Sequence, residues 1–420
     1  MANPFSTLWG SRKPMSTVRK NLIFINIESI PSIIVIQLMG GPFLTGYLIY
    51  LGASSQQIGF VLAVSALVNL IQIVMALVMQ RIRNRRVMVI ICFTFFRCLW
   101  VSAGLIPFFI SPEWAIQVYT ILFMMAFMCS AAGNVVWASL IGDLVPASVR
   151  GRYFGIRNTI IGAVGSIALY VGGQIMDRFP GGQGFQILFW LCVGIVIVNT
   201  VLMFKYPNAP FVPSVETDSL KMIHKPFRDR KYLKSVIFLS VYLFIMNISV
   251  PFFPYVMLKI LDLSYSSVSL IIVVHTIAIM VSNYVWGNLN TLHSNQRLLF
   301  YTLPFLALSC LLWGTLMFLP TMLVLILIHV VLGIGLGGFN QIAFNYIIGD
   351  TPKTERPMYI AVFSAFTGFF IFLGPLIGGR IYDWAKNYAE WIQIYGISAS
   401  VGFLLLVYGY FIGNRVLRNR

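Results

Sequence analysis

The chain has 420 residues, of which 59% are hydrophobic and only 10% are charged, and its mean hydropathy is +0.86. Soluble globular domains carry about 25% charged residues, so this composition excludes an ordinary soluble protein and indicates a polytopic membrane protein. The net charge of +17 would suit a nucleic-acid-binding protein, but its distribution along the chain favours another explanation. All five cysteines fall in apolar segments, which indicates buried small side chains and not disulfides or metal ligands.

Hydropathy predicts an all-α protein with twelve membrane-spanning helices. Basic residues precede the first apolar run, but no convincing small-residue cleavage site follows it, so we expect a retained helix and not a signal peptide. The expected spans, in chain order, are residues 21–50, 57–80, 87–111, 114–141, 156–177, 185–204, 235–260, 265–289, 298–319, 321–348, 358–380 and 391–413.

The basic residues are distributed very unequally between the two sides of these spans. With both termini placed in the cytosol, 24 Lys and Arg residues fall on the inner side and four on the outer side, while Arg97 lies within span three. This asymmetry is the positive-inside rule, and it predicts a cell-membrane protein with cytosolic termini. The excess of basic residues is then explained by the orientation of the chain in the membrane and by contact with anionic lipids on the cytosolic face, and it requires no nucleic-acid partner.

The chain contains an internal repeat. The inner end of span four reads "IGDLVPASVRGRYFG" and that of span ten reads "IIGDTPKTERPMYIA", which places Asp143 and Asp350 207 residues apart. Further matching pairs are 206 apart: Arg150 and Arg356, Tyr153 and Tyr359, Gly172 and Gly378, Gly173 and Gly379, and Asp177 and Asp383. The repeat predicts a duplicated six-helix unit.

This duplication predicts a simple organisation in which two six-helix bundles are joined by a cytosolic linker. Parallel repeats of six spans are a transporter architecture, with the substrate handled between the halves. The expected segments are a cytosolic N-terminal segment 1–20, a first bundle 21–204, a linker 205–234, a second bundle 235–413 and a cytosolic tail 414–420.

The loop between spans two and three reads "ALVMQRIRNRR" (76–86), and its second-half counterpart reads "GNLNTLHSNQR" (287–297). These loops and the duplicated spans resemble the major facilitator superfamily over nearly the whole chain. The family signature G-x-x-x-D-R-x-G-R-R is degraded here: Arg81 and the following basic residues are kept, but Gln80 replaces the aspartate. The second copy keeps Gly287 and Arg297 but has Thr291 in place of the aspartate.

The resemblance implies an inner gate at the cytosolic ends of the spans. Asp143 with Arg150, and Asp350 with Arg356, look like the family's acid–arginine pairs, and we interpret them as gating residues together with Arg81, Arg152 and Arg297. The alternative is that these are helix-end charges solvated by the cytosol.

Glu28 is the one acid in the spans that lies away from a membrane face. It lies about 10 Å from the expected start of span one, a span that lines the central cavity in the resembled family. A charged side chain at such depth is costly and marks a functional site by default, so we interpret Glu28 as the proton-coupling residue. The alternative is a structural ion pair with Arg97, which lies at a compatible depth in span three.

The other polar residues of the spans are candidates for lining the cavity. Histidines inside membrane helices are more often packing residues than titrating ones, and the amides are equally suited to joining helices. The candidates are Asn26, Asn134, Trp137, Tyr242, Asn247, His275, His329, Asn340 and Gln341.

Together these features predict a secondary active transporter and not an enzyme, because no catalytic triad, metal cluster, phosphate loop or ATP-binding motif is present. No cofactor is expected, and a proton gradient is the expected energy source. We favour proton-coupled export of a small organic molecule by a monomer. Proton-coupled uptake of a sugar or metabolite, flipping of a lipid-linked head group, and a non-transporting membrane sensor or scaffold are the alternatives.

Overall fold

The computed structural model describes residues 17–68, 71, 72, 75, 78, 84–146, 150–209, 226–349 and 356–418, and these residues form helices without any strand. The helices of the N-terminal half are α2 (Thr17–Met39), α3 (Gly41–Tyr50), α4 (Ser55–Leu67), α6 (Arg85–Ser102), η2 (Ala103–Leu105), α7 (Ile106–Phe109), α8 (Pro112–Leu144), α9 (Arg150–Arg178) and α10 (Gly182–Met203). Those of the C-terminal half are α12 (Arg230–Asn247), η4 (Val250–Phe252), α13 (Phe253–Tyr255), η5 (Val256–Ile260), α14 (Tyr265–Leu289), α15 (Asn295–Leu311), η6 (Leu312–Met317), α16 (Thr321–Gly349), α17 (Arg356–Ala385), η7 (Ile392–Gly396), α18 (Ile397–Gly413) and η8 (Asn414–Arg418).

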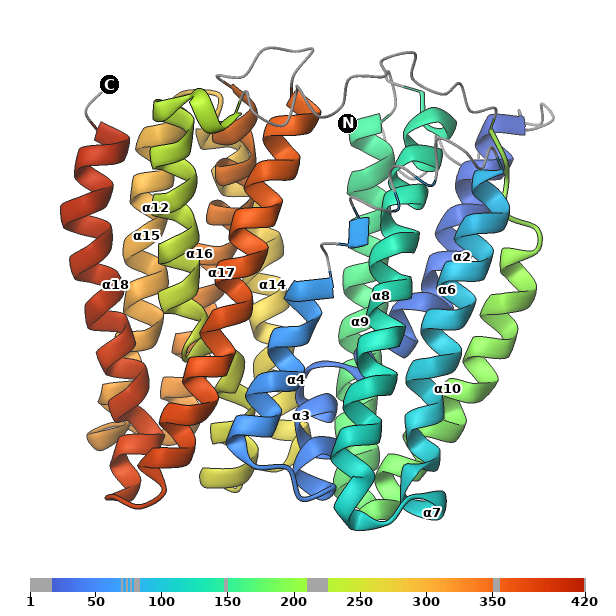
Figure 1. The fold of residues 1–420 in the computed structure, drawn as a ribbon, viewed down its shortest axis with the longest axis horizontal. Helices are drawn as coiled ribbons and strands as arrows, with labels where there is room; N and C mark the ends of the chain where they lie inside the picture. The colour runs from blue at the N-terminus through green and yellow to red at the C-terminus, as the bar shows by residue number, and fades with distance from the viewer. Residues whose placement is uncertain are drawn as a thin grey trace, which may run out of the picture.

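Eleven helical segments among the described residues are long and apolar enough to cross a membrane. A shorter apolar helix, α4, occupies the place of the expected second span, whose remaining residues lie largely outside the described part. In Figure 1 the start of α2 and the end of α18 lie at the same, upper end of the bundle. The expected all-α membrane fold is therefore confirmed.

Several span boundaries differ by a few residues from those expected, and two features of the spans have a clear local cause. The first span is interrupted between α2 and α3, where Gly41, the first residue of α3, has a φ of +52° and is followed by Pro42. A left-handed residue ends a helix, and glycine adopts that conformation without a Cβ clash. The seventh span begins at Arg230 and not at 235, because the Asp229 side chain accepts hydrogen bonds from the first free backbone N–H groups of α12.

The two halves contact each other through two pairs of helices, each made of one helix from either half. α4 of the N-terminal half packs on α17, and α14 of the C-terminal half packs on α9. Smaller contacts join α3 to α13, η5 and α14. Figure 1 shows α3 and α4 at the lower part of the molecule, between the two groups of helices.

A set of polar contacts closes the lower end between the halves. Both carboxylate oxygens of Asp177, on α9, accept hydrogen bonds from backbone N–H groups at the start of α14, at 2.8 Å from Tyr265 N and 3.0 Å from Ser266 N. Gly173 makes this approach possible, since a Cβ there would lie 2.9 Å from the Ser266 Cα. Between α4 and α13, the Ser55 hydroxyl donates to the Tyr255 hydroxyl at 3.3 Å.

Candidate functional site

A buried charged cluster lies inside the N-terminal half, where α2, α6 and α10 pack together. Glu28 on α2 is only 6% exposed. Asn199 on α10 donates hydrogen bonds of 3.0 Å to both the Glu28 Oε1 atom and the Glu28 backbone oxygen. The Arg97 Nη2 atom, on α6, lies 3.7 Å from the Glu28 Oε1 atom. The structure thus brings together the two ionisable residues that the sequence suggested as partners, and adds Asn199.

The Arg97 guanidinium is held mainly by groups other than Glu28. Its Nη2 atom donates to the Ser32 hydroxyl at 2.7 Å, and its Nη1 atom contacts the Met203 sulfur at 3.2 Å and the Phe93 backbone oxygen at 3.4 Å. Arg97 also lies 5.4 Å from the centre of the Phe93 ring. At 3.7 Å the pair with Glu28 is electrostatic and lacks a direct hydrogen bond. Protonation of Glu28 would therefore leave the guanidinium supported by its other contacts.

Arg157 and Tyr153, both on α9, extend this cluster and interact electrostatically with Glu28. The Arg157 guanidinium also stacks on the Trp137 ring at 4.8 Å. Four buried polar atoms of the cluster have no hydrogen-bond partner among the described residues: Arg97 Nε, Arg157 Nε, Asn199 Oδ1 and Tyr153 Oη. Such atoms are rare in folded proteins and concentrate at functional sites, because each carries a desolvation cost. The cluster therefore has hydrogen-bonding capacity left for water or substrate.

Asn134 and Asn340 occupy equivalent positions of the repeat, 206 residues apart, on α8 and α16. Both side chains are exposed. Ile116 lies on the same face of α8 as Asn134, five turns closer to the start of the helix, and it is buried. His329 lies on the same face of α16 as Asn340, three turns closer to the start of that helix, and it is buried too. The same face of each helix is thus covered toward the lower end and open toward the upper end. These two amides are the best-placed cavity candidates.

The remaining cavity candidates on spans one, four and seven have partners within their own half or are largely buried. The Trp137 indole N–H donates to the Tyr206 hydroxyl at 2.8 Å. Tyr242 is fully buried and donates to the Leu303 backbone oxygen on α15 at 2.7 Å. Asn247 donates to the Leu243 oxygen of its own helix at 2.8 Å, and the Asn26 Oδ1 atom is buried with no partner among the residues that the structure describes.

Gln341 and the two histidines lie between helices of the C-terminal half. The Gln341 side chain lies against Gly287 of α14, and its Oε1 atom is buried with no partner in the described part of the chain. His275 donates through Nδ1 to the His329 backbone oxygen at 3.0 Å, and His329 donates through Nδ1 to the Leu325 oxygen at 2.8 Å. The two imidazole rings lie edge to face, 6.0 Å apart. They form a neutral polar contact between α14 and α16.

At the upper end, Asp143 pairs with a residue that the sequence did not single out. The Asp143 Oδ2 atom lies 2.7 Å from the Nη2 atom of Arg85, which is fully buried and also donates to the Ser139 hydroxyl at 2.8 Å. This pair joins α6 to α8 within one half. Arg297 is exposed at the start of α15. The other expected gate residues, or their side chains, lie outside the described residues: Arg81, Arg150, Arg152, Asp350 and Arg356.

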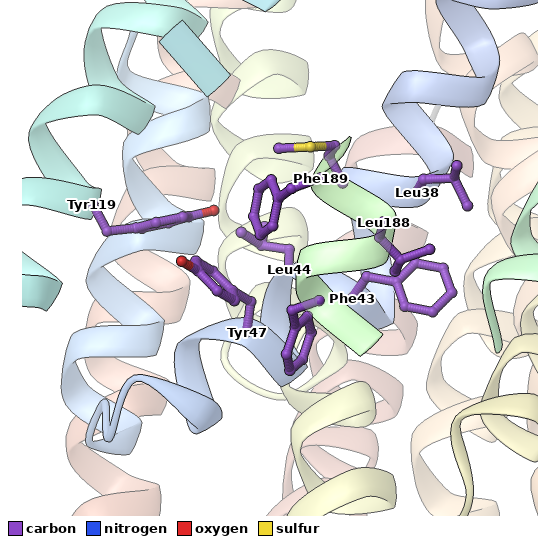
Figure 2. Close-up of a pocket in the computed structure, with 9 residues that line it drawn as sticks. Leu38, Phe43, Leu44, Tyr47, Tyr119, Leu188 and Phe189 are labelled. Atoms are coloured by element: carbon purple, nitrogen blue, oxygen red, sulfur yellow. The ribbon is translucent and has the colours of Figure 1, made fainter. Parts of the chain in front are cut away.

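Figure 2 shows an aromatic-lined cavity within the N-terminal half, where Tyr47 and Tyr119 point toward each other. Its volume is about 10 Å³, enough for no more than a single water molecule. It is therefore too small for an organic substrate. Among the described residues, no group of three or more His, Cys, Asp or Glu side chains could hold a metal ion.

Sequence reasoning missed three residues of these sites. Asn199 is the one amide among residues 187–204 of an otherwise apolar span, a signal that could have been used. Arg85 was hidden in a basic loop, where charge composition gives no sign that one guanidinium is buried. Asp177 was noted only as a member of the repeat, and its contact with α14 depends on how the halves meet.

The family and the fold follow from comparison with known proteins. A model of the Major Facilitator Superfamily matches residues 32–249 and 235–419. The chain is 28% identical over 134 residues to Multidrug resistance protein 3 of Bacillus subtilis (strain 168), a match that covers 32% of this chain but only 25% of that relative's length. Similar solved structures include a mutant of the nucleoside transporter NupG (TM-score 0.74, 13% identity, 93% of this chain and 99% of that chain) and the inward-open xylose transporter XylE from E. coli (TM-score 0.71, 12% identity, 93% and 96%). At these identities the structures show the fold alone, but the family match covers most of the sequence, and the chain belongs to the Major Facilitator Superfamily of membrane transporters.

Proposed function

We propose that this protein is a secondary active transporter that exports a small organic molecule in exchange for protons. Because the family consists of transporters and not of enzymes, the prediction that the chain is not an enzyme is confirmed. The partial similarity to a multidrug resistance protein supports export over uptake. The charge asymmetry of the loops supports a cell-membrane protein with its termini in the cytosol.

The observation that carries the proposed proton coupling is the buried carboxylate of Glu28, which accepts a hydrogen bond from Asn199 and lies 3.7 Å from Arg97. A charged group inside a membrane helix persists only with partners or a function. Here one hydrogen-bond donor, Asn199, and two nearby cations, Arg97 and Arg157, stabilise the anion. Protonation would remove the negative charge and weaken all three interactions together. Glu28 thus can hold either charge state, as a coupling site requires.

The packing offers a route from Glu28 to the contact between the halves. α2 carries Glu28 and packs on α9, which carries Arg157 and packs in turn on α14 of the other half. A change in the charge of Glu28 therefore acts on the helix that forms the Asp177 contact. Because Glu28 is 6% exposed in the present arrangement, proton exchange belongs to another state of the cycle.

Substrate binding is assigned to the surfaces that face each other toward the upper end. Asn134 and Asn340 supply one amide from each half, so a molecule that hydrogen-bonds both joins the halves. With the lower end closed by Asp177 and the upper faces exposed, this arrangement corresponds to an inward-open state if the termini are cytosolic. Exchange requires that protonation of Glu28 and occupation by substrate disfavour each other.

The test is proton flux in proteoliposomes that contain the purified protein and a trapped pH-sensitive dye. Addition of compounds from a panel should stimulate proton movement for the true substrates, and an imposed pH gradient should drive their accumulation. Glu28→Gln should abolish the gradient-driven accumulation while the protein stays folded. Glu113→Gln, which removes an exposed acid at the start of α8, is the matched control and should transport normally. Transport by wild type that is indifferent to the pH gradient and to a proton ionophore would contradict the proposal.

A further inference from the structure

A second cavity is lined only by residues of α14, of α15 and of the turn that joins them, all in the C-terminal half and none in the charged cluster. It is a groove of about 600 Å³ between α14 and α15. Trp286 and Leu289 of α14 form one wall, and Tyr301 and Phe305 of α15 form the other. Both helices pack on α16. Its volume falls within the range of about 300–1,000 Å³ that is usual for binding sites of organic ligands.

The groove is charged at one end and apolar at the other. His293 and Arg297, both exposed, lie at the turn between α14 and α15, at the end of the helices that connects them. Phe305 lies eight residues after Arg297 on α15, about 12 Å further along the helix axis. Tyr301, which is 47% exposed, lies between them on the same face. The lining therefore changes from cationic to aromatic and aliphatic along a single direction.

The membrane-spanning segment that contains α15 indicates where the cationic and apolar ends of the groove lie in the membrane. Arg297 lies in the first turn of Asn295–Met317, a segment long and apolar enough to cross a membrane, so we expect its guanidinium at the membrane surface. Among the described residues, no carboxylate lies within 4.0 Å of Arg297. The apolar part of the groove then extends into the acyl-chain region of the same leaflet.

We propose that this groove binds one anionic phospholipid from the leaflet on the side of α2's start and α18's end. The phosphate and the acidic head group contact Arg297 and His293. One acyl chain runs along Leu289, Tyr301 and Phe305. Charge complementarity selects the head group, and the apolar walls distinguish a lipid from a free anion, which would gain nothing from them.

The experiment is native mass spectrometry of the purified full-length protein, titrated with phosphatidylglycerol or with phosphatidylcholine of identical acyl chains. Wild type should bind its first phosphatidylglycerol more tightly than phosphatidylcholine. Arg297→Gln should weaken that first binding step by about fivefold, the effect of one cation at a membrane surface. Arg297→Lys should retain most of the affinity. Arg415→Gln removes an exposed arginine of η8 that does not line the groove, and this matched control should bind like wild type.

Filling the groove tests the apolar part separately. Leu289→Trp keeps both cations and should also weaken the first phosphatidylglycerol binding step. Inorganic phosphate in large excess should not compete with the lipid. The proposal is overturned if Arg297→Gln binds phosphatidylglycerol as wild type does, or if phosphate alone displaces the lipid. Because the readout is lipid binding, neither result depends on transport activity.

Discussion

The two halves of this transporter share one six-helix design but bury different kinds of polar side chain. In the N-terminal half the described buried residues include three charged ones, Glu28, Arg85 and Arg97. In the C-terminal half the described buried polar residues are all uncharged at neutral pH: Ser235, Ser240, Ser249, Ser269, Ser282, Thr302, Ser309, His329, Thr367, Gln393 and Ser398. Burial of a charge costs several kcal/mol, whereas a hydroxyl is satisfied by a backbone carbonyl. The duplicated fold therefore does not require the charges, which supports the proposal that Glu28 has a role in transport.

The same contrast recurs at the lower end, between residues that the repeat makes equivalent. Asp177 accepts two backbone hydrogen bonds from the start of α14, across the boundary between the halves. Asp383 instead pairs with Lys386, three residues further along its own chain, at 2.6 Å. The start of α4, which would be its counterpart partner, is capped by its own Ser54 and Gln57. One helix pair is thus held by a charge across the boundary, and the other by uncharged contacts.

The largest effect is expected from breaking the charged cluster of the N-terminal half. Arg97→Met leaves the Glu28 anion without its nearest cation and should lower the free energy of unfolding by about 3–5 kcal/mol, the usual cost of removing one partner from a buried pair. The double variant Glu28→Gln, Arg97→Met should recover part of that stability. Thermal unfolding in detergent and gradient-driven transport measure the two properties.

The double variant also separates the two interpretations of Glu28. If Glu28 couples protons, transport stays lost in the double variant even where stability returns. Recovery of gradient-driven transport would show instead that Glu28 only neutralises Arg97, because no carboxylate would remain there to carry the proton.

A smaller effect is expected at the upper end, where the halves again differ. Arg85→Met leaves the Ser139 hydroxyl and the Asp143 carboxylate without their shared donor, and should cost about 2 kcal/mol of stability. Arg297→Met removes an exposed cation and should change the unfolding temperature little. Equal losses in the two variants would show that burial does not distinguish the two arginines.

The neutral polar contacts of the C-terminal half should matter mainly for packing. His275→Gln loses one hydrogen bond to the His329 backbone and should cost about 1 kcal/mol. Its transport should keep the pH dependence of wild type. Loss of gradient-driven transport in this variant, with Glu28→Gln still active, would move the coupling site to the other half.

The smallest effect is expected at the lower end. Asp177→Asn weakens a charge–helix-dipole contact worth about 0.3–1 kcal/mol, which changes a two-state population up to about fivefold. The outward-facing population should rise, so a cysteine at Asn134 should react more slowly with an impermeant thiol reagent added from the upper side. Asp383→Asn is the matched control and should leave the labelling rate unchanged. Equal slowing in both variants would remove the distinction between the two helix pairs.

The sequence by itself determined the membrane class, the helical fold, the repeat and the depth of each ionisable residue, because these depend on composition and on distance along a helix. Depth was enough to suggest Arg97 as a partner of Glu28, since both residues could be measured from the start of their spans. The role of either residue in coupling stays a prediction.

Only the tertiary structure decided which neighbour each buried group faces. Asn199 is 171 residues from Glu28 in sequence, and its contact depends on the rotation of α2 and α10 about their axes, which an apolar span does not encode. Asp177 and Asp383 occupy equivalent places in the repeat, yet one bonds the opposite half and the other bonds Lys386. Their partners were decided by how the halves approach each other, because hydrogen bonds and ion pairs require distances of a few ångströms that spacing along the chain does not set.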